Sequence, residues 1–300
     1  MKKFNIPILL ITYKRPKYLE KVLKKIKKIN PSVIYVYSDG PKKNNEINDI
    51  NQCRKIINNI NWCSVKKKFN KKNMGIEKVP ILAINWIFKS ATKAIILEDD
   101  TIPELSFFKF CKSLLTKYKK KRKISMISGT NLVAENSKNL KESYFYSKYS
   151  NIWGWATWRD RWNSYDKLMK EWPSFKKRRL KQTSYNEREY LWWKKMFNLT
   201  YRNKSKNWDY QWTYQNFYKN RFSIVPKKNL VSNIGVLNGH GKNSSSLFNL
   251  KLKKINLPLI HPLKIAVDKN LDNKICNKTY ILPLITYRIK NKIKNLLSIN

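Results

Sequence analysis

The segment AIILEDDTIP, residues 94–103, joins a short apolar run to three acids and a proline. The apolar run Ala94–Leu97 predicts a buried strand, and Pro103 predicts the start of a helix that continues to Leu115. Glu98, Asp99 and Asp100 therefore come at the carboxyl end of a strand. Open α/β sheets bind their ligands at that edge.

Short apolar runs alternate with helical patterns on the N-terminal side of this segment. Apolar residues between Tyr18 and Ile29 recur at helical spacing, and lysines fill the opposite face. A second helix is expected around residues 47–60 and a third over residues 76–90. Strands are expected at Ile6–Thr12, Val33–Tyr37 and Trp62–Phe69. This alternation predicts an α/β fold, with a mostly parallel twisted sheet flanked by helices.

The alternation ends near residue 124, so the chain is divided into residues 1–124, 125–249 and 250–300. The middle part has short strands, aromatic clusters and helices, which predicts a mixed α+β half. The last part is a tail rich in Lys and Asn, in which Tyr287–Leu297 has the pattern of a short basic amphipathic helix. We expect the first two parts to form one domain.

The net charge of +45 allows two interpretations. One is attraction to nucleic acid, to an anionic membrane or to a phosphorylated ligand. The other is background composition, because Lys far outnumbers Arg, whereas readers of nucleic acid rely more on Arg. We expect no specific nucleic acid. We expect the basic surface and the segment after residue 250 to contact an anionic membrane or a negatively charged glycolipid.

The cysteines and the N-terminal sequence indicate in which cellular compartment the protein is expected. Cys53, Cys63, Cys111 and Cys276 form no C-x-x-C pair, so they suggest neither a zinc module nor a disulfide framework. The apolar run after Met1 is interrupted by Pro7 and is too short for a signal peptide or a membrane span. We expect a cytoplasmic protein, with or without a peripheral contact at the inner face of the membrane.

Three acids after a buried strand are costly unless a cation meets them. A divalent metal, Mn²⁺ or Mg²⁺, is such a cation. Because side chains alternate along a strand, Glu98 and Asp100 are expected on one side and Asp99 on the other. Asp100 is then the candidate metal ligand, and another acid can bind a sugar or ribose hydroxyl. The alternative is a solvated acidic turn that caps the next helix.

Seven motifs carry a resemblance to a known family. They are ITYKRPKYLEKVL (11–23), YVYSDGPK (35–42), NKKNMGIEK (70–78), ILEDD (96–100), SNIWGWATWRDRW (150–162), NWDYQW (207–212) and NGHG (238–241). In order and spacing they resemble bacterial family-two-like glycosyltransferases of the GT-A fold. They resemble more distantly the N-acetylglucosaminyltransferase I type, whose metal motif is also Glu-Asp-Asp. The resemblance covers roughly residues 4–242.

This resemblance implies an activity and its partners. It implies a metal-dependent transferase that moves a sugar from a nucleotide-diphosphate donor, for which we expect UDP, to a hydroxyl of a glycan or glycolipid. The first half would bind the donor, and residues 125–249 would form the acceptor side. A single base implies inversion at the anomeric carbon.

The resemblance also implies roles for residues near the nucleotide. Thr12, Arg15 and Asp39 would border the base and ribose, since an aspartate can accept the N3 hydrogen of uracil and an arginine can face a phosphate. Asn73 and Gly75 would lie in the loop that leads to the helix under the donor. The alternatives are a Ser-Asp-Gly-Pro turn at Asp39 and simple helix capping at Asn73.

The remaining candidates lie in the second half. Gly154 and Trp155 are expected near the sugar, and Trp158 and Trp162 in the core. His240 is expected to bind the metal or the diphosphate, whereas His261 is expected to be structural. Asp209 is the candidate base, and its alternative role is a helix N-cap.

Three other classes of protein have sequence requirements that can be compared with this chain. A nucleic-acid-binding protein would fit the basic runs, but no zinc, helix-turn-helix or RNA-binding motif supports it. A sugar nucleotidyltransferase needs a Gly-rich loop after its first strand, where this chain reads ITYKRP. A glycosidase needs two carboxyl groups separated across a cleft, which Asp99 and Asp100 do not supply by themselves.

Overall fold

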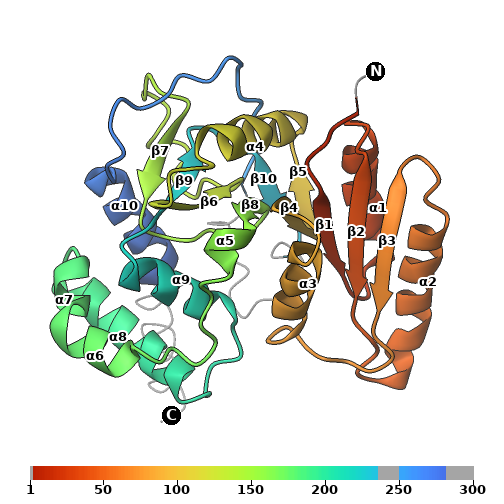
Figure 1. Cartoon of the computed structure of the whole chain (residues 1–300), viewed down its shortest axis with the longest axis horizontal. Helices are drawn as coiled ribbons and strands as arrows, with labels where there is room; N and C mark the ends of the chain where they lie inside the picture. Colours follow the sequence, from red (N-terminus) through yellow and green to blue (C-terminus); the bar gives the residue numbers. More distant parts are fainter. Residues whose placement is uncertain (1–2, 236–249, 282–300) are drawn as a thin grey trace, which may run out of the picture.

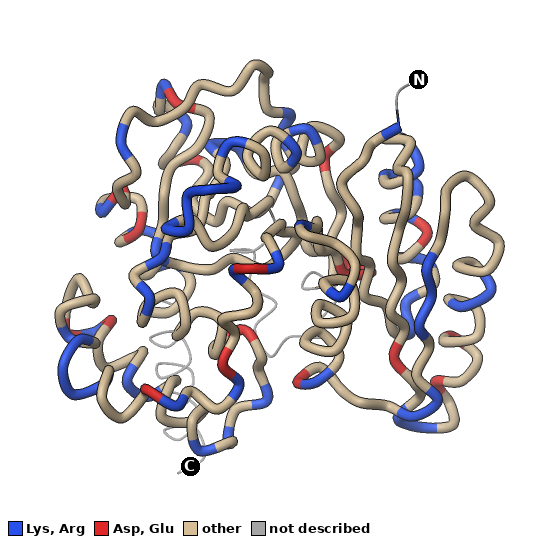
Figure 2. Tube along the Cα trace, in the orientation of Figure 1, with Lys and Arg blue, Asp and Glu red and all other residues tan. Residues whose placement is uncertain are grey.

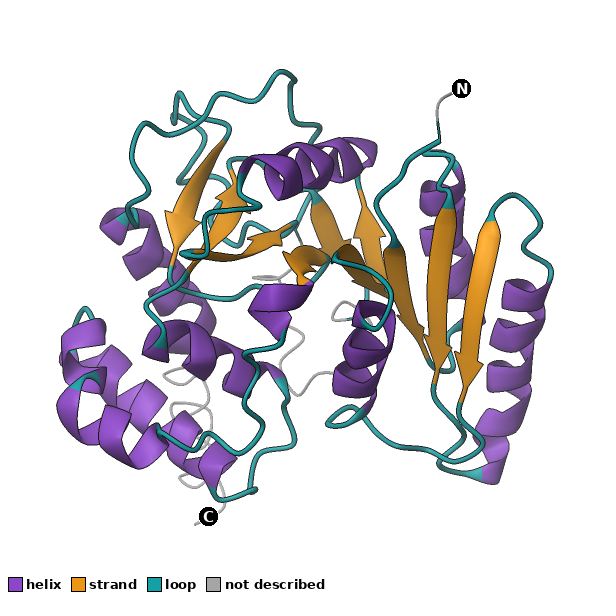
Figure 3. Cartoon of the chain, viewed as in Figure 1, coloured by secondary structure: helices purple, strands orange, loops and turns teal. Residues whose placement is uncertain are grey.

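The computed structural model describes residues 3–235 and 250–281. Its centre is an eight-stranded sheet in the order β3-β2-β1-β4-β8-β6-β9-β7, drawn in Figures 1 and 3. The strands are β1 (Ile8–Thr12), β2 (Val33–Ser38), β3 (Ser64–Phe69), β4 (Lys93–Glu98), β6 (Ile124–Ser128), β7 (Tyr144–Ser147), β8 (Trp155–Trp158) and β9 (Phe222–Pro226).

The sheet is mostly parallel, as predicted. Strands β1 to β4 pair in parallel, β8 is antiparallel to β4 and β6, and β7 is antiparallel to β9. Only β7 and β8 therefore run against the other six strands of this sheet. Because β8 pairs with β4, residues on both sides of the expected boundary near 124 belong to one sheet.

Helices cover both faces of the sheet. They are α1 (Pro16–Lys27), α2 (Ile47–Asn58), α3 (Val79–Phe88), α4 (Leu105–Lys117), α5 (Arg159–Trp162), α6 (Trp172–Arg178), α7 (Leu180–Thr183), α8 (Glu187–Tyr201), α9 (Asp209–Tyr218) and α10 (Lys269–Cys276). Among the described residues, no helix has both the length and the apolar composition needed to cross a membrane.

Alternation along the central strands produces two apolar layers. Ile8 and Leu10 of β1 pack in one cluster with residues of α1, α2 and α4. Leu9 and Ile11 pack on the other face with α3 and with tryptophans of the second half. Since a strand directs alternate side chains to opposite faces, fully apolar strands are expected where helices cover both sides.

The helix predicted from Pro103 begins later than expected. Residues Thr101–Pro103 form β5, a short strand antiparallel to β10 (Val231–Asn233), and α4 begins at Leu105. Glu104 is the N-cap, and its carboxylate accepts a hydrogen bond of 2.6 Å from the Ser106 amide. A capping carboxylate satisfies an amide that has no partner within the helix, so Glu104 sets the helix start.

Residues 250–281 pack onto the second half. Ile255 and Leu259 join the first apolar layer, and Leu271 and Ile275 of α10 join a third cluster with α6, α8 and α9. The described part of the basic tail therefore contributes to the core. The helical pattern at Tyr287–Leu297 lies outside the described residues.

Candidate active site

The three acids lie where β4 ends, beside the residues that follow β1. Asp99 accepts a 2.8 Å hydrogen bond from the Tyr13 amide. Arg15 donates through Nη1 to Asp100 Oδ2, and the same nitrogen lies 3.4 Å from Asp99 Oδ1. Arg15 directly precedes α1, so the start of this helix brings the cation to the acids.

The prediction that Asp99 and Asp100 point to opposite sides is wrong. Strand β4 ends at Glu98, and residues 99 and 100 form a turn, so strand alternation does not extend to them. Thr101 holds this turn, because its hydroxyl accepts from the Glu98 amide and donates to the Glu98 carbonyl. Both aspartates consequently contact one guanidinium group.

Negative charge exceeds positive charge around these acids. Burial, followed by the charges of Asp100 and Asp99, raises the pKa of Glu98 to about 8. Burial and the Asp100 charge likewise raise the pKa of Asp99 to about 7. Burial also raises the pKa of Asp100, although the adjacent Arg15 opposes this shift. One guanidinium group therefore does not balance the three carboxyl groups, and a second cation would be stabilised here.

Two buried oxygens in this region lack hydrogen-bond partners. They are Asp100 Oδ1 and Thr12 Oγ1, and their residues are 6% and 2% exposed. A buried polar atom without a partner is costly and is often satisfied by a ligand, ion or water. Thr12 ends β1 and Asp100 follows β4, which are neighbouring strands. These oxygens fit a polar or cationic ligand at this edge of the sheet.

Gly235 closes one side of the acid turn. The Ile234 amide donates to the Asp100 carbonyl at 2.9 Å, and a Cβ atom at Gly235 would overlap the Asp100 carboxylate. Pairing of β10 with β5 produces this close approach. Sequence reasoning missed Gly235, and an isolated glycine before the NGHG motif was the only signal for it.

The residues present fit a divalent cation in part. Asp100 offers a buried carboxylate oxygen, and the neighbouring acids supply uncompensated charge. Within residues 3–235 and 250–281, no group of three His, Cys, Asp or Glu side chains forms a metal centre. His240, the other predicted ligand, lies outside the described residues. Among the described residues, Asp100 Oδ1 is therefore one available oxygen, and Arg15 is the counter-charge of the acid turn.

Asp39 follows β2 and organises the loop that precedes α3. Its carboxylate accepts hydrogen bonds from the side chains of Asn70 and Asn73 and from the amides of Met74 and Gly75. The structure thus brings together Asp39, Asn73 and Gly75, which were predicted separately. Asn70 was not predicted, although it begins the same sequence motif.

Gly75 gives this loop the backbone conformation that leads into α3. Gly75 has φ of +79°, which residues with a Cβ rarely adopt. The Gly75 carbonyl accepts from the amides of Lys78 and Val79, so this glycine leads directly into α3. With both oxygens used by the loop, Asp39 acts here as a structural anchor of this edge of the sheet.

Asp209 is the first residue of α9, whereas Trp208 occupies the N-cap position. The alternative role of Asp209 as an N-cap is therefore wrong. Burial raises the pKa of Asp209 to about 6, and the amides of Asp209 and Tyr210 partly oppose this shift. The charge of Asp209 also contributes to the raised pKa values of Glu98 and Tyr165. The charge of Asp209 therefore acts on Glu98 of the acid turn, although the effect is smaller than those of burial and of the neighbouring aspartates.

Trp155 belongs to the core beneath this site. It is 1% exposed and packs against Trp162, Trp208 and Trp212 with ring centroids 5.9 to 6.3 Å apart. This burial leaves no ring face open for a sugar, so we assign Trp155 to the support of α9. Trp158 and Trp162 are also buried, as predicted.

Gly154 has a structural reason to be glycine. Its φ is +63°, and a Cβ atom there would lie 2.7 Å from a methyl group of Val231. Its carbonyl accepts a hydrogen bond of 2.7 Å from the Gly129 amide. Gly154 therefore joins β8 to the turn after β6. Its predicted position near the sugar remains a prediction.

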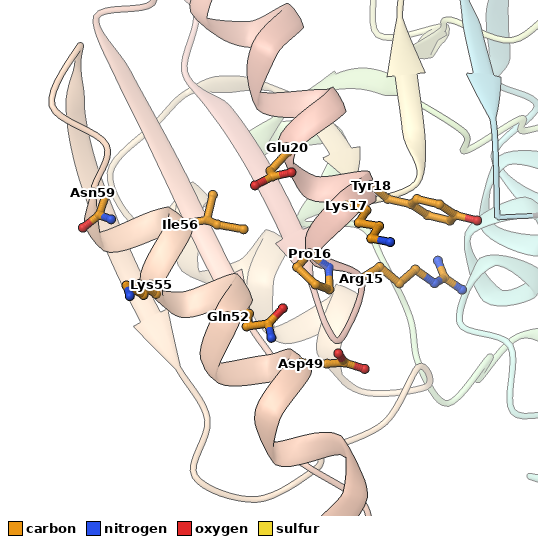
Figure 4. A pocket seen from close by; sticks show the side chains of 10 residues that line it. All are labelled: Arg15, Pro16, Lys17, Tyr18, Glu20, Asp49, Gln52, Lys55, Ile56 and Asn59. Carbon is orange, nitrogen blue, oxygen red and sulfur yellow. The ribbon is translucent and has the colours of Figure 1, made fainter.

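One hollow adjoins the acid site without including it. It has a volume of about 690 Å³ and lies between α1 and α2, lined by residues that include Lys17, Glu20, Asp49 and Gln52 (Figure 4). Arg15 lines this hollow and also contacts the acids. Charges of both signs line the hollow, so it has no excess of one charge that would select an ionic ligand. We therefore regard it as a groove between two helices and take the acid turn as the candidate site.

Comparisons with known proteins give only distant structural similarity. No protein-family model and no curated protein matches the chain. Among solved structures, it is similar to the mannosyltransferase PcManGT from Pyrobaculum calidifontis in complex with GDP-Man and Mn²⁺. That match has a TM-score of 0.36 and 13% identity, and it covers 52% of this chain and 44% of that chain.

A second similar structure is a UDP-glucose pyrophosphorylase complexed with UDP-glucose. Its TM-score is 0.42 and its identity 13%, and the match covers 78% of this chain and 95% of that chain. The chain thus spans less than half the length of the mannosyltransferase. At this level of similarity, the comparisons do not identify the reaction.

Proposed function

We propose that this protein is a glycosyltransferase that moves a sugar from a nucleotide-diphosphate donor to a hydroxyl of a glycan or glycolipid. One observation carries the proposal. The acid turn after β4 lies at the carboxyl edge of the sheet, where Asp99 and Asp100 contact one guanidinium group and Asp100 Oδ1 is buried without a hydrogen-bond partner. Ligands of open α/β sheets bind at that edge. The Glu-Asp-Asp motif and the other six motifs support the same reaction class.

The donor is proposed to be a UDP-sugar. Thr12 has a buried hydroxyl without a partner at the end of β1, and Arg15 supplies a guanidinium group that can bind a diphosphate. Asp39 holds the loop of Asn73 and Gly75 in place beside this edge. In this proposal these residues orient the donor, and its diphosphate faces the acid turn.

Asp209 is proposed to remove the proton from the acceptor hydroxyl. A carboxyl group with a pKa of about 6 is ionised at neutral pH and is more basic than an ordinary aspartate. Attack by the activated hydroxyl forms the new glycosidic bond as the bond to the diphosphate breaks, which inverts the anomeric configuration. A Mn²⁺ or Mg²⁺ ion held by Asp100 and His240 would stabilise the charge of the leaving nucleotide.

A donor screen tests the proposal. Ligand binding raises the free energy of unfolding by about 2.7 kcal/mol at a hundredfold excess over Kd, so thermal shifts with a panel of nucleotide sugars and Mn²⁺ should identify the donor. The identified donor should then yield free nucleoside diphosphate with added glycan acceptors. Formation of a nucleotide sugar from a nucleoside triphosphate and a sugar phosphate would instead show a nucleotidyltransferase. Strong and steeply salt-dependent binding to nucleic acid would favour the nucleic-acid alternative.

A further inference from the structure

Three large aliphatic side chains project from one loop of the segment before α10. Leu257, Ile260 and Leu263 are 45%, 59% and 102% exposed. They lie within seven residues of one another. Single exposed leucines are ordinary on protein surfaces, but a cluster of aliphatic side chains commonly marks an interaction site.

The backbone of this loop is held in place from beneath. The Ile255 amide donates to Ser106 Oγ at 3.0 Å, and the Ile260 amide donates to Ser143 Oγ at 2.9 Å. The Ser143 amide in turn donates to the Ile260 carbonyl, and Leu259 is buried. These contacts direct Leu259 inward and leave its neighbours outside.

Exposed lysines flank the three aliphatic side chains in sequence. The exposed lysines of the segment are Lys251, Lys253, Lys254 and Lys264. The sequence has no Asp or Glu from residue 250 to residue 267, although Glu135 lies 3.3 Å from Lys253. Burial, together with the charge of Lys117, lowers the pKa of His261 in the same loop. The loop therefore combines exposed aliphatic groups with a local excess of cations.

Charge alone would not select this surface. Lys and Arg occur along elements of both halves of the molecule (Figure 2). What distinguishes residues 251–266 is the coincidence of four exposed lysines, of which Lys264 lies within residues 256–266, with three projecting aliphatic side chains. This combination matches the interface of an anionic bilayer, where aliphatic groups enter the acyl boundary and lysines face the headgroups.

We propose that residues 256–266 dock the protein onto an anionic lipid bilayer, with Leu257, Ile260 and Leu263 as the inserting side chains. The loop crosses the top of Figure 1, whereas β1, β2 and β3 point toward the bottom. Docking through this loop leaves the carboxyl edge of the sheet open to solution. The loop therefore serves as an anchor rather than as part of the acceptor site, and the inference does not depend on the proposed reaction.

Cosedimentation with vesicles tests this docking. The full chain should bind vesicles of phosphatidylglycerol mixed with phosphatidylcholine and should bind vesicles of phosphatidylcholine alone much less. Replacement of Leu257, Ile260 and Leu263 by Ser should reduce partitioning by about tenfold or more, because apolar burial is lost. Leu168→Ser combined with Leu191→Ser is the matched control, since both leucines are exposed outside the loop. This control should bind as the unsubstituted chain does.

Two results would overturn the proposal. One is equal binding by the loop variant and the unsubstituted chain, and the other is no preference for anionic vesicles. Denaturation curves of each variant establish that it is folded. Sedimentation velocity without lipid gives a further check. A dimer formed by the unsubstituted chain and lost in the loop variant would assign the surface to a second copy of the chain instead.

Discussion

The Nη1 atom of Arg15 contacts the carboxylates of both Asp99 and Asp100, while Asp100 Oδ1 stays buried without a hydrogen-bond partner. A single cation thus serves two acids and leaves one oxygen unsatisfied. An anionic site of this kind stores unfavourable charge in the folded state, which a bound cation or donor complex can relieve. The stability of the protein should therefore report on what binds there.

We first predict that Mn²⁺ together with UDP stabilises the protein and that Asp100→Asn removes most of this effect. The neutral amide cannot compensate a cation as the carboxylate does. Thermal melting with and without EDTA measures this stabilisation, and Glu187→Gln, at an exposed position of α8, is the control. Equal stabilisation of the unsubstituted protein and the Asp100 variant would remove this residue from the ligand set.

The second prediction concerns pH and stability. The pKa of Glu98 is about 8 in the folded protein, above its ordinary value of 4.5, so between these values the folded state binds more protons than the unfolded state. Stability contributed by this group must then fall as pH rises from about 5 to about 8. Glu98→Gln should flatten this dependence and stabilise the protein at pH 8. Denaturant titrations at several pH values measure this dependence of stability on pH, with exposed Glu20→Gln as control. A difference between Glu98→Gln and the unsubstituted protein that does not change with pH would contradict the prediction.

The third prediction tests Asp39 as the anchor of the loop before α3. Asp39→Asn keeps the size of the side chain but replaces one accepting oxygen with a donor, which opposes the amides of Met74 and Gly75. We expect a loss of about 2 kcal/mol in stability, together with weaker UDP binding. Asp49→Asn at the start of α2 is the control. If UDP affinity falls while stability is unchanged, Asp39 binds the nucleotide directly and its anchoring role is minor.

Much of the fold could be predicted because strands and helices of the first half are local patterns. The apolar alternation from Ile8 to Leu97 specifies the parallel strands and their order along the chain. The pairing of β8 between β4 and β6 is not local, since Trp155 contacts its partner strand across 59 residues from Ile96. No short pattern indicates which strand of the second half joins the edge of the first.

The site was predicted in part for the same reason. The acids after β4 and the loop motif at Asn73 are visible as residues, and their position at a strand end follows from the fold. Their contacts depend on the turn at Asp99 and Asp100, which ends the strand alternation on which the sequence argument relied. Gly235 reaches Asp100 only because β10 pairs with β5, a pairing that no sequence pattern indicated.

The last prediction concerns Asp209 as the base of the reaction. This residue begins α9 between Trp208 and Trp212 in sequence, both of which belong to the buried tryptophan cluster, and burial raises the pKa of Asp209 to about 6. Asp209→Asn keeps the shape of the side chain but cannot accept a proton, so turnover should fall by about a hundredfold or more while donor affinity and folding are retained. In the unsubstituted enzyme turnover should decline as pH falls below about 6, because protonated Asp209 is not a base, and the variant should lack this decline. Exposed Glu187→Gln is the control for a loss of negative charge in the same half. Near-normal turnover in Asp209→Asn would show that this residue only supports the helix start, and a product with retained anomeric configuration would exclude direct displacement.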